Sequence, residues 1–339
     1  MIDRYTPLGT PVVCRNGIFE LDKAGLERIL QYQIDAKVKG VVVNGTTGEF
    51  FNMRIGNVNP GIRTLNLMTV RDMIPRDIKV ITNVTASDRA GSLDDVFNDT
   101  KDQVEIAYQL NSDALLLMPY YHDEINPDNV LEFCYEVADI SKVPVILYDN
   151  PMMHSALGDN RFSADQLEEL AGHRRIVGVK ITGDSRSTVE GVLKQLPSDF
   201  KIYLGNEEML WFALQQDRKP DGVVYSMGNI VPGLVQDVMA DPSEAGKYRW
   251  KLARKGAYKE NISRRDVEAG TTDGFSAEHI THSRVWKAYK DMLRVIAGLK
   301  AHLSQRGIIE SGKLLNGAEV KLGLKKIRML QLAEELSGK

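Results

Sequence analysis

The sequence predicts an α/β fold, a (β/α)8 TIM barrel followed by a C-terminal helical appendage. Eight short apolar runs rich in β-branched residues recur along the first two thirds of the 339 residues. Because these runs lack polar alternation, they are typical of parallel strands covered on both faces. Segments with helical periodicity separate them, as in a barrel of alternating strands and helices. A doubly wound open sheet is the alternative, since local patterns do not show closure, and the count of eight favours the barrel.

The predicted strands follow one another between residues 11 and 226. They are Pro11–Cys14, Gly40–Asn44, Lys79–Asn83, Ala114–Met118, Pro144–Tyr148, Ile176–Ile181, Lys201–Leu204 and Gly222–Ser226. Helices are expected between them at 23–37, 102–110, 127–140 and 163–171. Ser163 is the expected N-cap of the last of these, with Gln166 at the capping-box spacing. Asn52–Asn66, rich in Gly, Asn and Pro, is expected to form a long loop after the second strand.

Beyond about residue 240 the strand pattern stops. Helices are expected at 245–259, 284–303 and 320–336, with turn-rich breaks between them. The sequence therefore predicts a catalytic barrel over 1–240 and a helical region over 241–339.

Composition and charge exclude several classes of function. The net charge of −3 and the pI near 6.1 give no electrostatic basis for binding nucleic acid or an anionic membrane surface. Two cysteines, Cys14 and Cys134, make neither a disulfide framework nor a zinc pattern. The close pair His279 and His282 has no obvious third ligand, so we expect no metal site. With no signal-peptide pattern and no apolar run near 20 residues, the protein is expected to be cytoplasmic.

The candidate reactive residue is Lys180, near the carboxyl end of the apolar run Ile176–Ile181. An ammonium buried in such a strand must pair, reach water or lose its proton. A neutral amine is the nucleophile that forms a Schiff base with a carbonyl.

The carboxyl ends of parallel barrel strands share one mouth, where active sites of this fold lie. The second strand delivers Gly45-Thr46-Thr47-Gly48-Glu49, a turn that can aim backbone N–H groups and two hydroxyls at a carboxylate. An ordinary glycine-rich turn is the alternative. The motif is not a phosphate loop, because it lacks the Gly-Lys-Ser/Thr ending.

Other strand ends bring phenols, hydroxyls and carboxylates to the same mouth. A tyrosine beside a Schiff-base lysine can move protons to and from the carbinolamine, so Tyr148 is a candidate acid/base group. The further candidates at strand ends are Tyr121, Gly205, Glu207, Glu208 and Ser226. Paired Glu207 and Glu208 would otherwise be a solvated turn.

Taken together, the motifs resemble the dihydrodipicolinate synthase / N-acetylneuraminate lyase family of pyruvate-dependent class I aldolases. The matching motifs are Gly45-Thr46-Thr47-Gly48-Glu49, the strand end Tyr148 to Pro151, and Gly178-Val179-Lys180. The resemblance implies that Lys180 condenses with the keto carbon of pyruvate or another 2-oxo acid. It implies that Thr47 holds the carboxylate, and that Tyr148 is the general acid/base, linked through Thr46 to Tyr121 of a neighbouring subunit. The covalent Schiff base would need no other cofactor and no metal.

The resemblance also implies a substrate pocket and an assembly. Expected substrate-binding positions are Thr47, Gly48, Thr182, Gly205, Glu207, Glu208 and Ser226. The family is commonly a homotetramer built as a dimer of dimers, so at least a dimer is expected here. The expected partner is a small 2-oxo acid.

Two departures bear on the substrate. Asp149 stands where the family has asparagine after the tyrosine, which adds a carboxyl group close to the site. Met153 stands where the dipicolinate branch has the arginine that binds the aldehyde substrate's carboxylate. Thr182 and the turn Gly205-x-Glu207-Glu208 lean towards the sugar-acid lyases instead.

Three hypotheses follow for the activity. The first is a lyase that reversibly cleaves a 2-oxo sugar acid to pyruvate and an aldehyde through Lys180. The second keeps the Schiff base but dehydrates a 2-oxo-3-deoxy sugar acid, or condenses pyruvate with a semialdehyde as a dihydrodipicolinate synthase does. The third is a barrel that binds a 2-oxo acid without catalysis, with Asp149 disturbing the proton relay.

Overall fold

The computed structural model describes residues 2–53, 56–88, 91–151, 153, 161–182, 185–240, 243–257 and 295–313. Its parallel strands close into an eight-stranded barrel, which confirms the predicted fold class. The order around the barrel is β1-β10-β9-β8-β7-β6-β5-β4. The strands are β1 Asp3–Pro7, β4 Gly40–Val43, β5 Lys79–Asn83, β6 Ala114–Leu117, β7 Val145–Asp149, β8 Ile176–Ile181, β9 Lys201–Leu204 and β10 Gly222–Val224.

The prediction that Pro11–Cys14 forms the first barrel strand was wrong. Val12–Arg15 forms β2, which pairs antiparallel with β3, Ile18–Leu21, in a separate two-stranded sheet. The first barrel strand is instead β1, which pairs in parallel with β10. Its sequence, Asp-Arg-Tyr-Thr-Pro, has no apolar run, although four of its five residues are buried. A hydrophobic pattern therefore could not identify it.

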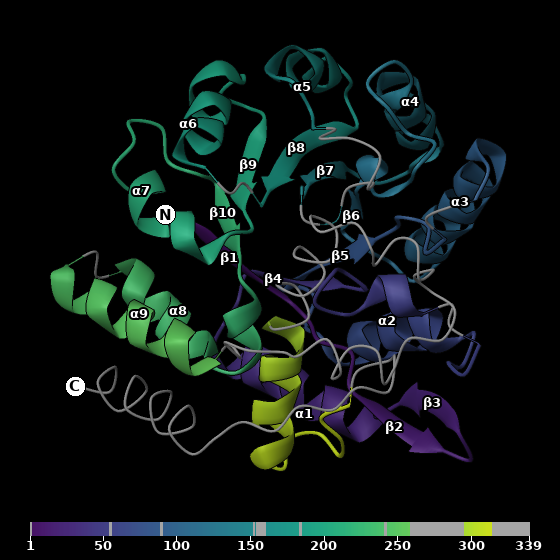
Figure 1. The fold of residues 1–339 in the computed structure, drawn as a ribbon, viewed down its shortest axis with the longest axis vertical. Coiled ribbons are helices and arrows are strands. Elements are labelled where there is room, and N and C mark those ends of the chain that lie inside the picture. The colour runs from purple at the N-terminus through teal and green to yellow at the C-terminus, as the bar shows by residue number, and fades with distance from the viewer. Residues whose placement is uncertain are drawn as a thin grey trace, which may run out of the picture. The chain divides into compact units, whose positions relative to one another are not determined.

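Helices alternate with the barrel strands as predicted, although the helix expected at 102–110 begins nine residues earlier, at Leu93. They are α1 Lys23–Asp35, α2 Ile62–Met73, α3 Leu93–Gln109, α4 Val130–Ile140, α5 Ala164–Ala171, α6 Arg186–Gln195, α7 Leu210–Ala213, α8 Pro232–Ala240 and α9 Glu244–Ala257. Figure 1 shows α3 to α6 on the outer side of strands β5 to β9. The predicted capping box of α5 is confirmed, with Ser163 accepting from the Gln166 N–H.

The long loop predicted at 52–66 is shorter than expected. Its last five residues belong to the first turns of α2, which begins at Ile62. The helix was missed because Asn66 interrupts the apolar pattern, yet this side chain is fully buried and bonded to Asn44. Asn66 therefore lies in a helix and takes part in a buried hydrogen-bond network, not in a loop.

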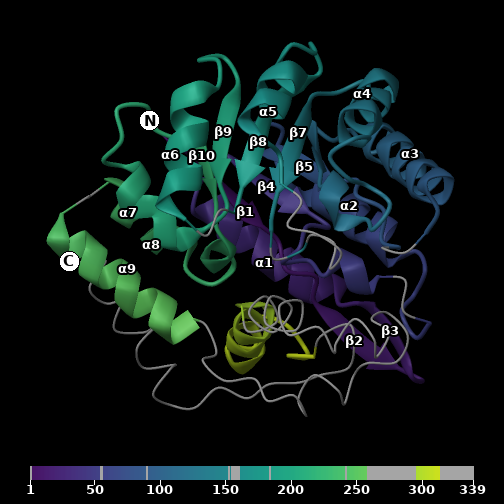
Figure 2. The ribbon, with the colours of Figure 1, turned by 45° about the horizontal axis from the view of Figure 1, so that its top comes forward.

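The chain divides into two compact units. One contains residues 1–5 and 79–225, with the first three residues of β1 and the strands β5 to β10, and the other contains residues 6–78 and 226–339. In the second unit, a helix at 295–305 lies beside α1, where Arg28 Nε donates to the carbonyl of Ile308 (2.6 Å) (Figure 2). This helix overlaps the helix predicted at 284–303 and ends two residues beyond it. The first part of that prediction and the helix predicted at 320–336 lie outside the described residues. None of the described helices is long and apolar enough to span a membrane.

Candidate active site

Lys180 lies in the buried interior of the first unit. It stands in β8 beside Tyr148 of β7, its partner in the parallel register, and its side chain is only 6% exposed. The ammonium Nζ lies 3.6 Å from the centroid of the Tyr148 ring, a cation–π contact. No carboxylate of the described residues lies within ion-pair distance of Lys180. The amine is therefore held close to a phenol, with no acid that would fix it as an ion pair.

Two side chains hold the hydroxyl of Tyr148. Asn150 Nδ2 donates to it at 3.0 Å and Thr182 Oγ1 at 3.4 Å. Thr182 was predicted at the site, but Asn150 was not. A signal existed in its spacing, because residues two apart in a strand face the same side. The two donors fix the phenol oxygen beside the lysine.

Gly205 makes room for the lysine side chain. A Cβ at this position would lie 2.8 Å from Lys180 Cε and 2.3 Å from Thr182 Oγ1. Such distances are too short for carbon or oxygen contacts, so a larger residue would displace one of the two side chains. The structure thus gives Gly205 a steric role beside the substrate-binding role that was predicted.

Asp149 points away from the lysine. Successive side chains of a strand face opposite sides, so Asp149 lies on the face of β7 opposite to Tyr148. On that side its negative charge contributes to raising the pKa of Tyr120, an effect dominated by burial of the phenol. Asp149 is a buried carboxyl group next to Tyr148 in the chain, as expected from the sequence, but strand alternation places it on the opposite face from Lys180.

The remaining candidates of the first unit differ in exposure. Glu207, in the turn after β9, is 8% exposed, whereas Glu208 is exposed to solvent. Tyr121 is buried, and its hydroxyl donates to the carbonyl of Ser87 (3.3 Å). Its contribution to a neighbouring subunit stays a prediction. Met153, at the position of the dipicolinate-branch arginine, is buried at 2% exposure.

The glycine–threonine turn lies in the second unit. Its backbone closes on itself through bonds from Gly48 N to Gly45 O and from Glu49 N to Thr46 O, both 3.0 Å. None of the described residues accepts a hydrogen bond from the N–H of Thr46 or Thr47. The Thr46 hydroxyl is also buried without a hydrogen-bond partner among them. These three unused donors suit a carboxylate.

Several side chains secure this turn. Thr47 Oγ1 lies 2.8 Å from Ser226 Oγ, so two predicted substrate-binding residues meet. Thr10 Oγ1 donates to the carbonyl of Gly48 (2.8 Å), where a Cβ would come within 3.1 Å of that hydroxyl. Gly48 therefore keeps the turn closely packed against the segment before β2.

Two residues with left-handed backbone conformation bracket the turn. Asn44 has φ 56° and Glu49 has φ 61°, values that cost a non-glycine residue about 1 kcal/mol or more. Asn44 is held by a bond from Asn66 Nδ2 to its Oδ1 (2.8 Å) and donates to the carbonyl of Arg63 (3.0 Å). Glu49 is fully buried, and it forms an ion pair with Lys300. These partners were not predicted, because they lie far from the turn in sequence.

The described residues contain no group of three or more His, Cys, Asp or Glu side chains that could hold a metal ion. His279 and His282 lie outside the described residues. Cys134 is buried, and burial raises the pKa of its thiol well above its usual range. Cys134 has the character of a small apolar side chain, whereas Cys14 is exposed.

Comparison with known proteins agrees with these motifs. Residues 8–255 match the model of the Dihydrodipicolinate synthetase family. The chain belongs to this family. Members of the dihydrodipicolinate synthetase family are pyruvate-dependent Schiff-base aldolases and lyases, and this chain is accordingly an enzyme of the carbon–carbon lyase type.

Three relatives of this chain show low sequence identity to it. It is 24% identical to the 4-hydroxy-tetrahydrodipicolinate synthase of Alkaliphilus oremlandii (strain OhILAs) over 65% of this chain and 70% of the relative. Among solved structures, CdNal from Clostridium difficile in complex with mannosamine has a TM-score of 0.70 at 18% identity, covering 100% of this chain and 98% of the other. YagE, a prophage protein of the dihydrodipicolinic acid synthase family from E. coli K12, in complex with pyruvate, has a TM-score of 0.67 at 18% identity, covering 99% and 98%. At these identities the structural likeness concerns the fold.

Proposed function

We propose that this enzyme reversibly cleaves a 2-oxo sugar acid to pyruvate and an aldehyde through a Schiff base on Lys180. The observation that carries the proposal is the buried Lys180 amine, placed 3.6 Å from the Tyr148 ring centroid and free of a carboxylate partner among the described residues. A buried amine beside a phenol is the arrangement that imine chemistry needs. Family membership supports the same reaction class.

In the proposed cycle, the neutral Lys180 amine attacks the keto carbon of the substrate. The carbinolamine loses water, with Tyr148 passing the proton, and leaves an iminium. The C–C bond then breaks as Tyr148 takes the proton of the neighbouring hydroxyl, and the bonding electrons enter the enamine. An aldehyde departs, a proton returns to the enamine carbon, and water hydrolyses the iminium to release pyruvate and the free lysine.

The turn residues take the anionic end of the substrate in this proposal. The unused N–H groups of Thr46 and Thr47 and the Thr46 hydroxyl support a carboxylate at the turn. Thr47, Gly48 and Ser226 are proposed to bind substrate there. Gly205, Glu207 and Glu208 follow β9, and Thr182 follows β8. Of the two carboxylates, buried Glu207 is better suited to hold a substrate hydroxyl than exposed Glu208.

Condensation of pyruvate with a semialdehyde is the second candidate activity. The name of the Alkaliphilus relative, 4-hydroxy-tetrahydrodipicolinate synthase, favours it. Against it stands Met153, a buried side chain at the position where that branch carries its carboxylate-binding arginine. A methionine offers no bidentate donor, so the aldehyde substrate of that branch loses its partner.

The test is intact-protein mass spectrometry after borohydride reduction, with and without pyruvate, on wild type and Lys180→Ala. A pyruvate-sized adduct on wild type alone is expected. An adduct that persists in Lys180→Ala would refute the assignment of the nucleophile, and its absence from both proteins would exclude pyruvate from the site. Product analysis then separates the activities, because a lyase releases pyruvate from a sugar acid whereas a dehydratase releases water and no pyruvate.

We propose that the enzyme assembles as a homotetramer, a dimer of dimers, with Tyr121 at an interface, as the family resemblance implies. Sedimentation of wild type and Tyr121→Phe, with activity measured across the same protein concentrations, tests it. A fully active monomer would contradict the shared role of Tyr121.

A further inference from the structure

A buried ion pair joins the turn at 45–49 to the helix at 295–305. Lys300, in the helix at 295–305, is 2% exposed, and its ammonium pairs with the fully buried carboxylate of Glu49. A second bond runs from Lys300 Nζ to the carbonyl of Lys313 (3.1 Å), and Asn52 Nδ2 donates to the other oxygen of Glu49 (3.3 Å). Both charged groups are thus removed from water and paired with each other.

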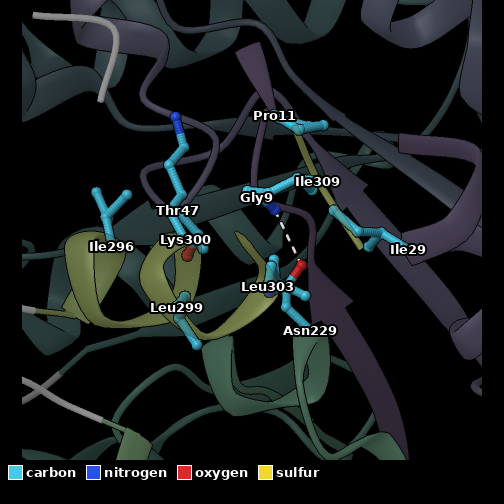
Figure 3. Close-up of a pocket in the computed structure, with 10 residues that line it drawn as sticks. All are labelled: Gly9, Pro11, Ile29, Thr47, Asn229, Ile296, Leu299, Lys300, Leu303 and Ile309. Atoms are coloured by element: carbon cyan, nitrogen blue, oxygen red, sulfur yellow. Dashed lines mark hydrogen bonds between the residues drawn. The ribbon is translucent and has the colours of Figure 1, made fainter. Parts of the chain in front are cut away.

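The pair lies directly against the turn. Glu49 is the last residue of the motif, and its own N–H closes the turn on the carbonyl of Thr46. Lys300 also lines a cavity of about 10 Å³ together with Thr47, Gly9 and Asn229. Figure 3 shows Lys300 and Thr47 side by side at this cavity. With room for no more than about one water molecule, the space offers no alternative solvation for either charge.

We propose that Lys300 is a positioning residue, which holds Thr46 and Thr47 in the carboxylate-binding geometry through Glu49. Glu49 has a left-handed backbone, a conformation that a non-glycine residue keeps only when its surroundings enforce it. At the other end of the turn, Asn44 has the same conformation and is held by Asn66 of α2. Lys300 holds Glu49 in its left-handed conformation, as Asn66 holds Asn44.

Removing one partner of a buried pair leaves an uncompensated charge, which the structure relieves by rearranging around it. Here the element next to the pair is the turn itself. Lys300→Met, which keeps the length of the side chain but removes the charge, is therefore expected to release the turn.

The helix supplies a matched control. His302, two residues along the same helix, is also 2% exposed, and its Nε2 donates to the carbonyl of Gly256 (3.0 Å). His302→Leu removes one buried polar contact of the helix without touching the turn. A merely structural role of Lys300 would make the two variants behave alike.

The proposal rests on the proposed function for its catalytic consequence, so the experiment has two arms. In the first, hydrogen exchange of the peptide 44–53 is followed by mass spectrometry without substrate. Lys300→Met is expected to exchange faster there, whereas His302→Leu and wild type exchange alike. In the second, borohydride trapping is titrated with pyruvate. Lys300→Met is expected to raise the half-saturating pyruvate concentration between about 10-fold and 100-fold, the scale of a slightly misplaced binding group.

Removing the charge of both Glu49 and Lys300 is expected to restore the turn geometry that Lys300→Met disturbs. The double variant Glu49→Gln/Lys300→Met removes both charges of this pair and keeps an acceptor for Asn52, so slow exchange and pyruvate affinity should return towards wild type. If Lys300→Met is not recovered folded, Glu49→Gln makes the same comparison. Equal effects of Lys300→Met and His302→Leu, or unchanged exchange at 44–53, would overturn the proposal. If wild type gives no pyruvate adduct, the proposed function fails, and the exchange arm still decides the role of Lys300.

Discussion

The lysine region of the first unit and the turn region of the second are built in different ways. Lys180, Tyr148 and Thr182 stand in or directly after neighbouring strands, where the parallel register alone brings them together. The turn at 45–49 has two left-handed residues at its ends, and it depends on side chains from α2 and from the helix at 295–305. The first region is positioned by backbone hydrogen bonds, and the second by long-range side-chain contacts.

The difference teaches which perturbations each region tolerates. Strand-borne residues move only if a neighbour physically displaces them, because the ladder fixes the backbone. A turn held by side chains is loosened when any one of its distant partners is lost. Substitutions in the lysine region should therefore lower the rate of Schiff-base formation at saturating 2-oxo acid. Substitutions around the turn should instead raise the half-saturating concentration of the 2-oxo acid.

The largest effect is expected for Gly205→Ala in the lysine region. The new methyl would collide with Lys180 Cε and Thr182 Oγ1, so the amine is displaced. The rate of borohydride trapping with saturating pyruvate should fall by about 100-fold or more, the scale of a misplaced reacting group. Gly191→Ala on α6, where a Cβ meets nothing within 4 Å, is the matched control and should trap at the wild-type rate. Equal rates for the two variants would show that Gly205 does not limit the lysine.

A different kinetic signature is expected for Gly48→Ala in the turn region. Its Cβ would press on the Leu8 carbonyl and the Thr10 hydroxyl at 3.1 Å, which requires a shift of a few tenths of an ångström. The half-saturating pyruvate concentration should rise by about 10-fold, with little change in the rate at saturation. Gly233→Ala on α8, with open space around its Cβ, provides the control. If Gly48→Ala lowered the trapping rate at saturating pyruvate without raising the half-saturating concentration, the two regions would not differ in their kinetic effect.

A smaller effect is expected where Tyr148 is held. Asn150→Leu removes the donor at 3.0 Å, and Thr182→Val removes the longer one at 3.4 Å. One lost hydrogen bond corresponds to about 3-fold to 10-fold in turnover, and we expect the larger loss for Asn150→Leu. Steady-state turnover of the sugar acid that supports catalysis is the measurement. If both variants turn over as wild type does, Tyr148 does not depend on these donors.

The last effect concerns the pH dependence of stability rather than activity, at Tyr120 in the turn after β6. Burial raises the pKa of the Tyr120 phenol to about 12, and the hydrogen bond to Gln166 partly offsets this. Because the pKa is higher in the folded protein than in the unfolded chain, the stabilisation is complete below pH 10 and is lost as the pH rises from about 10 to about 12. Urea unfolding across this range should show wild type losing up to about 2 kcal/mol more than Tyr120→Phe. Parallel losses in both proteins would contradict the assignment to Tyr120.

Strand and helix positions were largely predictable from the sequence, with instructive failures. The run Ile176–Ile181 is β8 residue for residue, because an apolar β-branched segment between turns has few alternatives. The strand β1 was missed because its buried residues include Arg4 and Thr6, which no hydrophobic pattern identifies. Asn66 was placed in a loop for the same reason. Buried polar residues mislead a hydrophobic analysis wherever the structure supplies their hydrogen bonds.

By itself, the sequence predicted the barrel and singled out Lys180, Tyr148 and the glycine–threonine motif as candidates, since each candidate depends on spacing within a short segment. Only the tertiary structure decided that Asn150 donates to the Tyr148 hydroxyl and that Lys300 forms an ion pair with Glu49. Lys300 lies 251 positions after Glu49 in the chain, so no local pattern links them. The physical reason is that local spacing fixes which face a residue takes, whereas the partner of a buried charge is chosen by the packing of the whole unit.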